Sequence, residues 1–192
     1  GIGADNFGTA DGGTATAHSY ADSESVLVDI MKWFPEESFR VTKPEAHLYL
    51  FCDLDWFFEW KRELTDAGWK VFRTPLIWVK DNGRVPLPKH GPRRLYECIL
   101  YARKGNKEVN FIGGDVLTFS TDENLGMSAQ KPVALYHELL RRSTRPGDYI
   151  LDPFCGTGTI FPAAKLAQCR AIGIELNSVT ADIAAKRLRD AG

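Results

Sequence analysis

One stretch, residues 149–159, constrains the fold more than any other part of the chain. It begins with the apolar run Tyr149-Ile150-Leu151, reaches an acid at Asp152, and passes through Gly156-Thr157-Gly158 into the apolar residues 160–164. This order predicts a strand, a tight loop and the start of a helix, where backbone amides and absent Cβ atoms let a ligand approach closely. The stretch therefore predicts an α/β fold with a small-molecule site at the end of a strand.

A second carboxylate follows the next apolar run. Residues 171–176 are predicted to form a neighbouring parallel strand that ends in Glu175. A carboxylate at the tip of the strand after a glycine loop is placed to accept hydrogen bonds from ribose hydroxyls. The three-glycine fingerprint of dinucleotide sites is absent, so the ligand need not be NAD. Asp152 and Phe154 beside the turn suit a nucleoside that carries an amino acid.

The loop resembles that of a known family. Residues 152–159, Asp-Pro-Phe-Cys-Gly-Thr-Gly-Thr, are similar to the S-adenosylmethionine loop of the DNA methyltransferases that modify adenine N6 or cytosine N4. Gln130-Lys131-Pro132 resembles the Lys-Pro signature that precedes this loop in the permuted subclass, whose catalytic half comes first. The resemblance covers residues 128–190. It implies a Rossmann-like methyltransferase sheet, mostly parallel with one antiparallel strand, and helices on both faces.

The resemblance also implies S-adenosylmethionine as the cofactor and suggests a role for each residue around the loop. Asp152 is expected to receive the methionine ammonium group, and Glu175 to hold the ribose. The glycines are expected to permit close approach, and the Lys-Pro pair to line the methionine end chiefly through its backbone. The predicted cofactor-binding residues are Lys131, Pro132, Asp152, Phe154, Cys155, Gly156, Gly158, Thr159, Glu175 and Asn177.

The first residues resemble the segment that follows the catalytic tetrapeptide in this family. Gly1-Ile2 and the glycines after them look like that sequel, so residues 1–20 are predicted to form a loop at the target base; a frayed terminus is the alternative. The tetrapeptide, Asp-Pro-Pro-Tyr or a relative, and the catalytic group are expected just before Gly1. Two further strands are expected there as well. We therefore predict a gap in the sheet beside the strand that ends at Asp152, and an N-terminally incomplete single methyltransferase domain over residues 1–192.

Hydrophobic periodicity predicts the remaining elements. Strands are expected over three apolar runs, residues 46–52, 74–80 and 95–102, the last being the antiparallel one. Helices are expected from Ser25 to Phe34 with Pro35 as the stop, from Asp53 or Asp55 to Leu64, from Pro132, and from Asn177 or Ser178. Residues 104–130 show little periodicity and take the place of the target-recognition region of the subclass, although they are too few for a large recognition domain.

Charge confines any contact with DNA to local patches. The net charge of −1 gives no global attraction to nucleic acid. Prolines and glycines forbid regular structure between residues 81 and 94, where Arg84, Lys89, Arg93 and Arg94 are predicted to contact the phosphates of double-stranded DNA; a solvated loop is the alternative. The arginines at 141, 142 and 145 are expected to form a solvated face.

Other cofactors and compartments are not indicated. The four cysteines include no C-x-x-C pair and the four histidines have no metal spacing, so we expect reduced thiols and no metal site. No apolar run reaches membrane-spanning length, and a cytoplasmic location without membrane contact is expected.

The sequence thus predicts a site-specific DNA methyltransferase that transfers a methyl group from S-adenosylmethionine to adenine N6, or to cytosine N4. Adenine is favoured because the Gly-Ile sequel fits that type slightly better. The alternative from another class is a catalytically inactive cofactor-binding or DNA-binding module of a longer protein.

Overall fold

The computed structural model describes residues 24–80, 92, 94–122 and 130–191. The helices are α1 (Glu24–Val41), the 3-10 turn η1 (Leu54–Trp56), α2 (Phe57–Asp66), α3 (Val133–Ser143), α4 (Ile160–Leu166) and α5 (Ser178–Ala191). The strands are β1 (Ala46–Cys52), β2 (Lys70–Val71), β3 (Leu76–Val79), β4 (Tyr96–Lys104), β5 (Val116–Thr118), β6 (Tyr149–Asp152) and β7 (Arg170–Gly173). Within this part of the chain, every helix is too short or too polar to cross a membrane.

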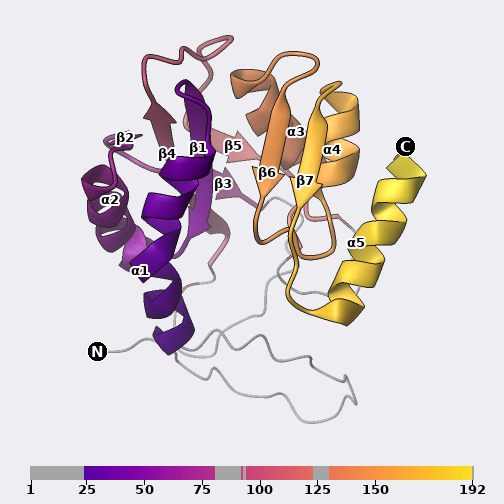
Figure 1. Ribbon diagram of the computed structural model, residues 1–192, viewed down its shortest axis with the longest axis horizontal. Helices are drawn as coiled ribbons and strands as arrows, with labels where there is room; N and C mark the ends of the chain where they lie inside the picture. The colour runs from indigo at the N-terminus through magenta and orange to yellow at the C-terminus, as the bar shows by residue number, and fades with distance from the viewer. Residues whose placement is uncertain (1–23, 81–91, 93, 123–129, 192) are drawn as a thin grey trace.

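The strands form two sheets (Figure 1). The larger sheet has the order β1-β4-β3-β5, with β2 also paired to β4. Strand β4 is antiparallel to β1, β2 and β3, whereas β3 and β5 are parallel, so the antiparallel strand predicted over residues 95–102 is confirmed. Among the described residues β6 pairs only with β7, in parallel. The described strands therefore form no continuous ladder beside β6, and the missing strands predicted there from the sequence stay a prediction.

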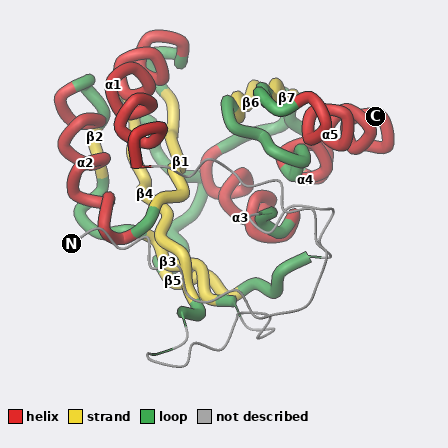
Figure 2. Tube along the Cα trace, turned by 90° about the horizontal axis from the view of Figure 1, so that it is seen from below, coloured by secondary structure: helices red, strands yellow, loops and turns green. Residues whose placement is uncertain are grey.

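Helix α3 lies between the two sheets and packs against both. Its residues Leu135 and Leu139 join the cluster on one face of the larger sheet, around Trp78 and Ile99. Its Leu140 joins a second cluster with α4, α5 and the inner face of β6 and β7. Figure 2 shows α3 between the larger sheet and the β6–β7 pair. A helix with apolar side chains on two sides can hold together two layers that share no backbone hydrogen bonds.

Helices α1 and α2 cover the other face of the larger sheet (Figure 2). Phe34, Trp60 and Trp69 are buried there against Leu100 and Ala102 of β4. Among the aromatic residues after β1, Phe57, Trp60 and Trp69 are therefore core residues, whereas Trp56 is only partly buried and Phe58 is 72% exposed. Continuous apolar runs such as β1 are typical of strands covered on both faces.

The predicted end of the first helix at Pro35 is wrong, because α1 continues through this proline to Val41. Proline removes one backbone donor from a helix. The following turn nevertheless has strong tertiary support. Phe39 packs edge-to-face on Trp69 at 5.7 Å, and the Lys104 ammonium donates to the carbonyls of Phe39 and Thr42 at 2.5 and 3.0 Å. These contacts hold the last turn in place beyond the proline.

Two further differences from the predicted elements concern short strands. The sequence does not reveal β2 and β5, because segments of two or three residues carry no readable alternation. The strand predicted over residues 171–176 ends early, at Gly173, and Glu175 lies in the turn that follows it. Ile174 still bonds across to the loop, donating to the carbonyl of Asp152 and accepting from the amide of Cys155.

Stability at acid pH should depend on His47 of β1. Its ring stacks on Tyr101, and its nitrogens lie 2.8 Å from the Tyr101 hydroxyl and 3.3 Å from the Glu108 carbonyl. Burial, together with nearby Lys107 and Arg103, lowers the pKa of this imidazole despite the Glu108 carbonyl. The unfolded chain therefore binds a proton at a higher pH than the folded chain does.

We expect the contribution of uncharged His47 to the free energy of unfolding to be complete above the pKa of an unperturbed histidine, near 6.5. This contribution should be lost as pH falls toward the lower pKa of His47 in the folded state. A His47→Gln variant should lose less free energy of unfolding than the wild type between pH 7.5 and 5, as measured by urea denaturation. Parallel pH curves for the two proteins would contradict this prediction.

Candidate cofactor site

The loop between β6 and α4 turns back on itself at two glycines. Gly156 and Gly158 have φ angles of 53° and 79°, which residues with a Cβ atom rarely adopt. The Gly158 amide donates to the Cys155 carbonyl at 2.8 Å, and the Cys155 amide donates to the Ile174 carbonyl at 3.0 Å. The loop is thus a fixed turn at the carboxyl ends of β6 and β7, the edge at which parallel α/β sheets bind ligands.

Asp152 ends β6 and faces the start of this loop. Its Oδ1 accepts a hydrogen bond from the Phe154 amide at 3.1 Å. Burial raises the pKa of Asp152, and the nearby Glu175 carboxylate raises it further, while the Phe154 amide and the Tyr136 hydroxyl lower it. The two acids therefore lie close enough to repel each other.

Glu175 closes the loop from the opposite side. Its Oε2 accepts from the Gly156 amide at 3.0 Å, and its Oε1 accepts from the Asn177 amide at 2.8 Å. A carboxylate oxygen has two lone pairs, so each oxygen can still accept a bond from a ligand hydroxyl. Glu175 therefore lies beside the glycine loop. The sequence predicts that it ends the second strand, but in the structure it follows the end of β7.

This arrangement has the chemistry of a site for a cationic ligand with hydroxyl groups. None of the ion pairs among the described residues involves Asp152 or Glu175. Burial and the neighbouring Glu175 disfavour the charged form of Asp152, so an ammonium group beside this carboxylate would be stabilising. The residues present thus fit the charge and hydroxyls of S-adenosylmethionine.

The Lys131-Pro132 segment is fastened to the loop and to the larger sheet. The Thr159 hydroxyl donates to the Lys131 carbonyl at 3.1 Å, and the Lys131 ammonium lies 2.9 Å from Glu97 of β4. The same Glu97 carboxylate pairs with Lys80 at 2.7 Å. Burial opposes ionisation of Glu97, but the two lysines outweigh it and lower its pKa. Lys131 therefore links Glu97 of β4 to Thr159 in the loop that follows β6.

The other predicted cofactor residues surround the loop in different ways. Phe154 is half exposed, with its ring 5.6 Å from Phe34 and 6.4 Å from Trp33 of α1. Cys155 is buried in the cluster between α3, α4 and α5, and its thiol lies 3.9 Å from the Gly156 carbonyl. Asn177 caps α5 by accepting from the amide and hydroxyl of Thr180. Pro132 is fully buried as the N-cap of α3.

Several contributors to the loop are not identified from the sequence. The Arg187 guanidinium of α5 reaches the Thr157 carbonyl at 3.4 Å and the Thr159 hydroxyl at 3.2 Å. Tyr136 falls in the helix predicted from Pro132 and Glu97 in the strand predicted over residues 95–102, and neither prediction gives them a role beside the loop. A polar side chain at a helix or strand position that is expected to be buried needs a hydrogen-bond partner, and this signal could have identified Tyr136 and Glu97.

Most of the predicted DNA contacts lie outside the described residues. These are Arg84, Lys89 and Arg93, together with residues 1–20. Arg94 is described, and its guanidinium lies 2.8 Å from the Asp53 carboxylate and donates to the Tyr96 carbonyl at 3.3 Å. Its contact with phosphate stays a prediction.

The expected solvated face of three arginines is wrong for Arg142. This side chain is buried, pairs with Glu138 at 3.0 Å and donates to the Gly114 carbonyl at 2.8 Å. The Asn110 side-chain amide also bonds to the end of α3, donating to the carbonyls of Arg141 and Thr144. Within the predicted recognition region, Asn110 and Gly114 thus contact the end of α3, whereas Val116–Thr118 forms β5 of the larger sheet.

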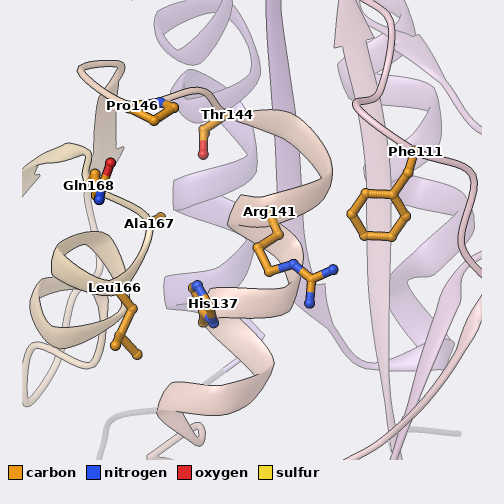
Figure 3. Close-up of a pocket in the computed structure, with 8 residues that line it drawn as sticks. All are labelled: Phe111, His137, Arg141, Thr144, Pro146, Leu166, Ala167 and Gln168. Atoms are coloured by element: carbon orange, nitrogen blue, oxygen red, sulfur yellow. The ribbon is translucent and has the colours of Figure 1, made fainter.

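A separate hollow of about 340 Å³ opens beside these residues (Figure 3). His137 and Arg141 of α3, with Thr144 just after it, line one side, and residues 166–168 at the end of α4 line the other. Pro146 and Gln168 precede β6 and β7, so the hollow lies at the opposite end of these strands from Asp152. It therefore takes no part in the candidate cofactor site.

Similarity to solved structures defines the class of the fold. The M1.HpyAVI–SAM complex superimposes with a TM-score of 0.71 at 24% sequence identity, covering 84% of this chain and 83% of that one. The cytosine-N4-specific PvuII DNA methyltransferase superimposes with a TM-score of 0.70 at 16% identity, covering 92% and 76%. The fold is that of the DNA methyltransferases, and the predicted α/β methyltransferase architecture is confirmed.

Sequence comparison narrows the class to a family. Residues 118–186 match the N6/N4 methyltransferase family described as DNA methylase. The type II methyltransferase M.HinfI of Haemophilus influenzae is 44% identical over 187 residues, covering 73% of this chain and 51% of the relative. M2.DpnII of Streptococcus pneumoniae is 30% identical over 168 residues, covering 78% and 62%. The chain is therefore a relative of the N6/N4 DNA methylases, which confirms the resemblance seen in its loop, and it spans about half the length of the curated relatives it matches.

The second glycine of the loop should be required for packing as well as for its backbone angle. A Cβ atom on Gly158 would lie 2.8 Å from the Phe161 ring and 2.9 Å from the Ala184 Cα atom of α5. Gly147 has a similar φ of 87°, but a Cβ atom there would meet nothing within 4 Å. We expect Gly158→Ala to cost about 2–4 kcal/mol in the free energy of unfolding, and Gly147→Ala about 1 kcal/mol. Urea denaturation measures both values, and equal losses would contradict the packing role.

Proposed function

We propose that this chain is the cofactor-binding part of an S-adenosylmethionine-dependent DNA methyltransferase. The observation that supports the proposal most is the pair of carboxylates, Asp152 and Glu175, on either side of the glycine loop at the ends of β6 and β7. The similarity to relatives that are named type II methyltransferases also supports the proposal.

In this proposal Asp152 accepts the methionine ammonium group, and Glu175 accepts the ribose hydroxyls. Gly156 brings the backbone close to the ligand, and Lys131 and Pro132 line its methionine end. The cofactor supplies an activated methyl group on a sulfonium. The chain's own residues hold the donor in one orientation and exclude water, which is the main protein contribution to an in-line displacement.

The acceptor is an exocyclic amine of a base taken out of the double helix. We propose adenine N6 over cytosine N4, on the basis of the Gly1-Ile2 sequel, which lies outside the described residues. Arg84, Lys89, Arg93 and Arg94 are the proposed phosphate contacts on double-stranded DNA. The catalytic group is proposed to come from chain that precedes Gly1 in the full-length protein.

The cofactor site is tested by calorimetry with S-adenosylhomocysteine. Glu175→Ala should weaken binding at least tenfold, about 1.4 kcal/mol, because it removes the ribose acceptor and the bond to the Gly156 amide. Glu175→Gln keeps a neutral acceptor and should lose less. Asp148→Ala is the matched control, since its carboxylate bonds the Arg145 amide at the other end of β6. Unchanged binding by Glu175→Ala would show that the ribose assignment is wrong.

The reaction itself is tested on the full-length protein with labelled cofactor and DNA, followed by identification of the modified base. We expect label as N6-methyladenine. N4-methylcytosine would overturn the choice of base and leave the enzyme class intact. Cofactor binding without label in DNA would favour the inactive cofactor-binding module instead.

A further inference from the structure

The Glu97 carboxylate of β4 joins three separate segments of the chain. Its Oε1 lies 2.7 Å from the Lys80 ammonium at the end of β3, and its Oε2 lies 2.9 Å from the Lys131 ammonium just before α3. No more than 22% of any of these three side chains is exposed. Solvent therefore screens the two pairs less than it screens the exposed ion pairs of α1 and α2, and they can hold a segment in place.

The segment that contains Lys131 is bonded to the glycine loop at two threonines. The Thr159 hydroxyl donates to the Lys131 carbonyl at 3.1 Å, and the Thr157 hydroxyl donates to the side-chain oxygen of Gln130 at 3.2 Å. Both threonines are buried, and they flank Gly158 in the turn. Residues 130 and 131 therefore support the loop through hydrogen bonds on both sides of its second glycine.

A continuous series of polar contacts thus runs from the larger sheet to the loop. It passes from the Glu97 carboxylate to the Lys131 ammonium, and from the Lys131 carbonyl to Thr159. The Phe51 ring of β1 lies 5.5 Å from the same ammonium and further restricts it. Apolar packing is non-directional, whereas ion pairs and hydrogen bonds have a preferred geometry. These polar contacts can therefore define the orientation of the loop relative to β4.

We propose that Glu97 is a positioning residue of the cofactor site, which acts through Lys131 to hold the glycine loop in the shape that binds its ligand. The inference rests on the proposed function of that loop. It adds a residue of the larger sheet to a site whose other proposed residues all lie at or beyond position 131 in the chain.

Glu97→Gln tests the proposal, because it keeps the size of the side chain and removes its charge. We expect this variant of the full-length protein to bind S-adenosylhomocysteine about fivefold more weakly in calorimetry. Without ligand, the backbone amide signals of Gly156 and Gly158 in a proton–nitrogen NMR correlation spectrum should move from their wild-type positions, since the loop has lost its fixed support.

Lys80→Met is the matched control. It breaks the other ion pair of the same carboxylate and leaves the Glu97–Lys131 pair in place. The Lys80 backbone is held within the larger sheet, where its amide donates to the Leu95 carbonyl at 2.8 Å. This variant should lose stability, but its affinity and its two glycine signals should stay as in the wild type. Equal weakening of binding by Lys80→Met and Glu97→Gln overturns the inference, because a general loss of stability would then explain both.

A double-mutant cycle tests whether Glu97 acts through Lys131. Lys131→Met breaks the same pair from the other side and leaves Glu97 paired with Lys80, so the fold keeps a paired carboxylate. It should move the same glycine signals, and adding Glu97→Gln to it should cause no further loss of affinity. Fully additive losses overturn the inference.

The glycine signals also separate this inference from the proposed function. Signals that stay unchanged in Glu97→Gln and Lys131→Met overturn the inference whether or not the ligand binds. Signals that move as expected in a protein that binds no S-adenosylhomocysteine overturn the proposed function, and with it the role of Glu97 toward the cofactor.

Discussion

Helix α3 is the element on which the rest of this structure depends, because it packs against two sheets that share no backbone hydrogen bonds among the described strands. Leu135 and Leu139 face the larger sheet, and Leu140 faces α4 and the β6–β7 pair. Burying apolar area on both sides stabilises the junction without a continuous strand ladder. The position of the glycine loop relative to β1 and β4 follows from this packing.

Charged and polar contacts of the candidate site cross the same junction between the larger sheet and the β6–β7 pair. Glu97 of β4 pairs with Lys131, whose carbonyl accepts from the Thr159 hydroxyl. Asp152 and Glu175 are held by backbone amides of the loop and of the segment after β7, and the larger sheet holds Lys131 beside them. Such buried pairs are costly to leave half satisfied, so the site and the junction should be lost or retained together.

Sequence reasoning succeeded where a segment carries its own signal. Strand β1 is a continuous apolar run, and its predicted bounds are those observed. The strand β6, the turn at Gly156 and Gly158 and the start of α4 were all predicted from local order. It failed where the signal is short or where distant contacts override it. Strands β2 and β5 are too brief to show alternation, and α1 passes Pro35 because Trp69 and Lys104, far along the chain, hold its last turn.

The sequence by itself determined the loop, the acids at Asp152 and Glu175 and the relationship to the N6/N4 DNA methylases, because glycine turns, strand ends and motif spacing are local properties of the chain. Only the tertiary structure decided that Tyr136, Glu97 and Arg187 support that loop. Each is distant in sequence from the group it contacts, and each lies in an element whose pattern predicts only core or surface. Side-chain contacts of this kind depend on how α3, β4 and α5 pack around the loop, which no local pattern encodes.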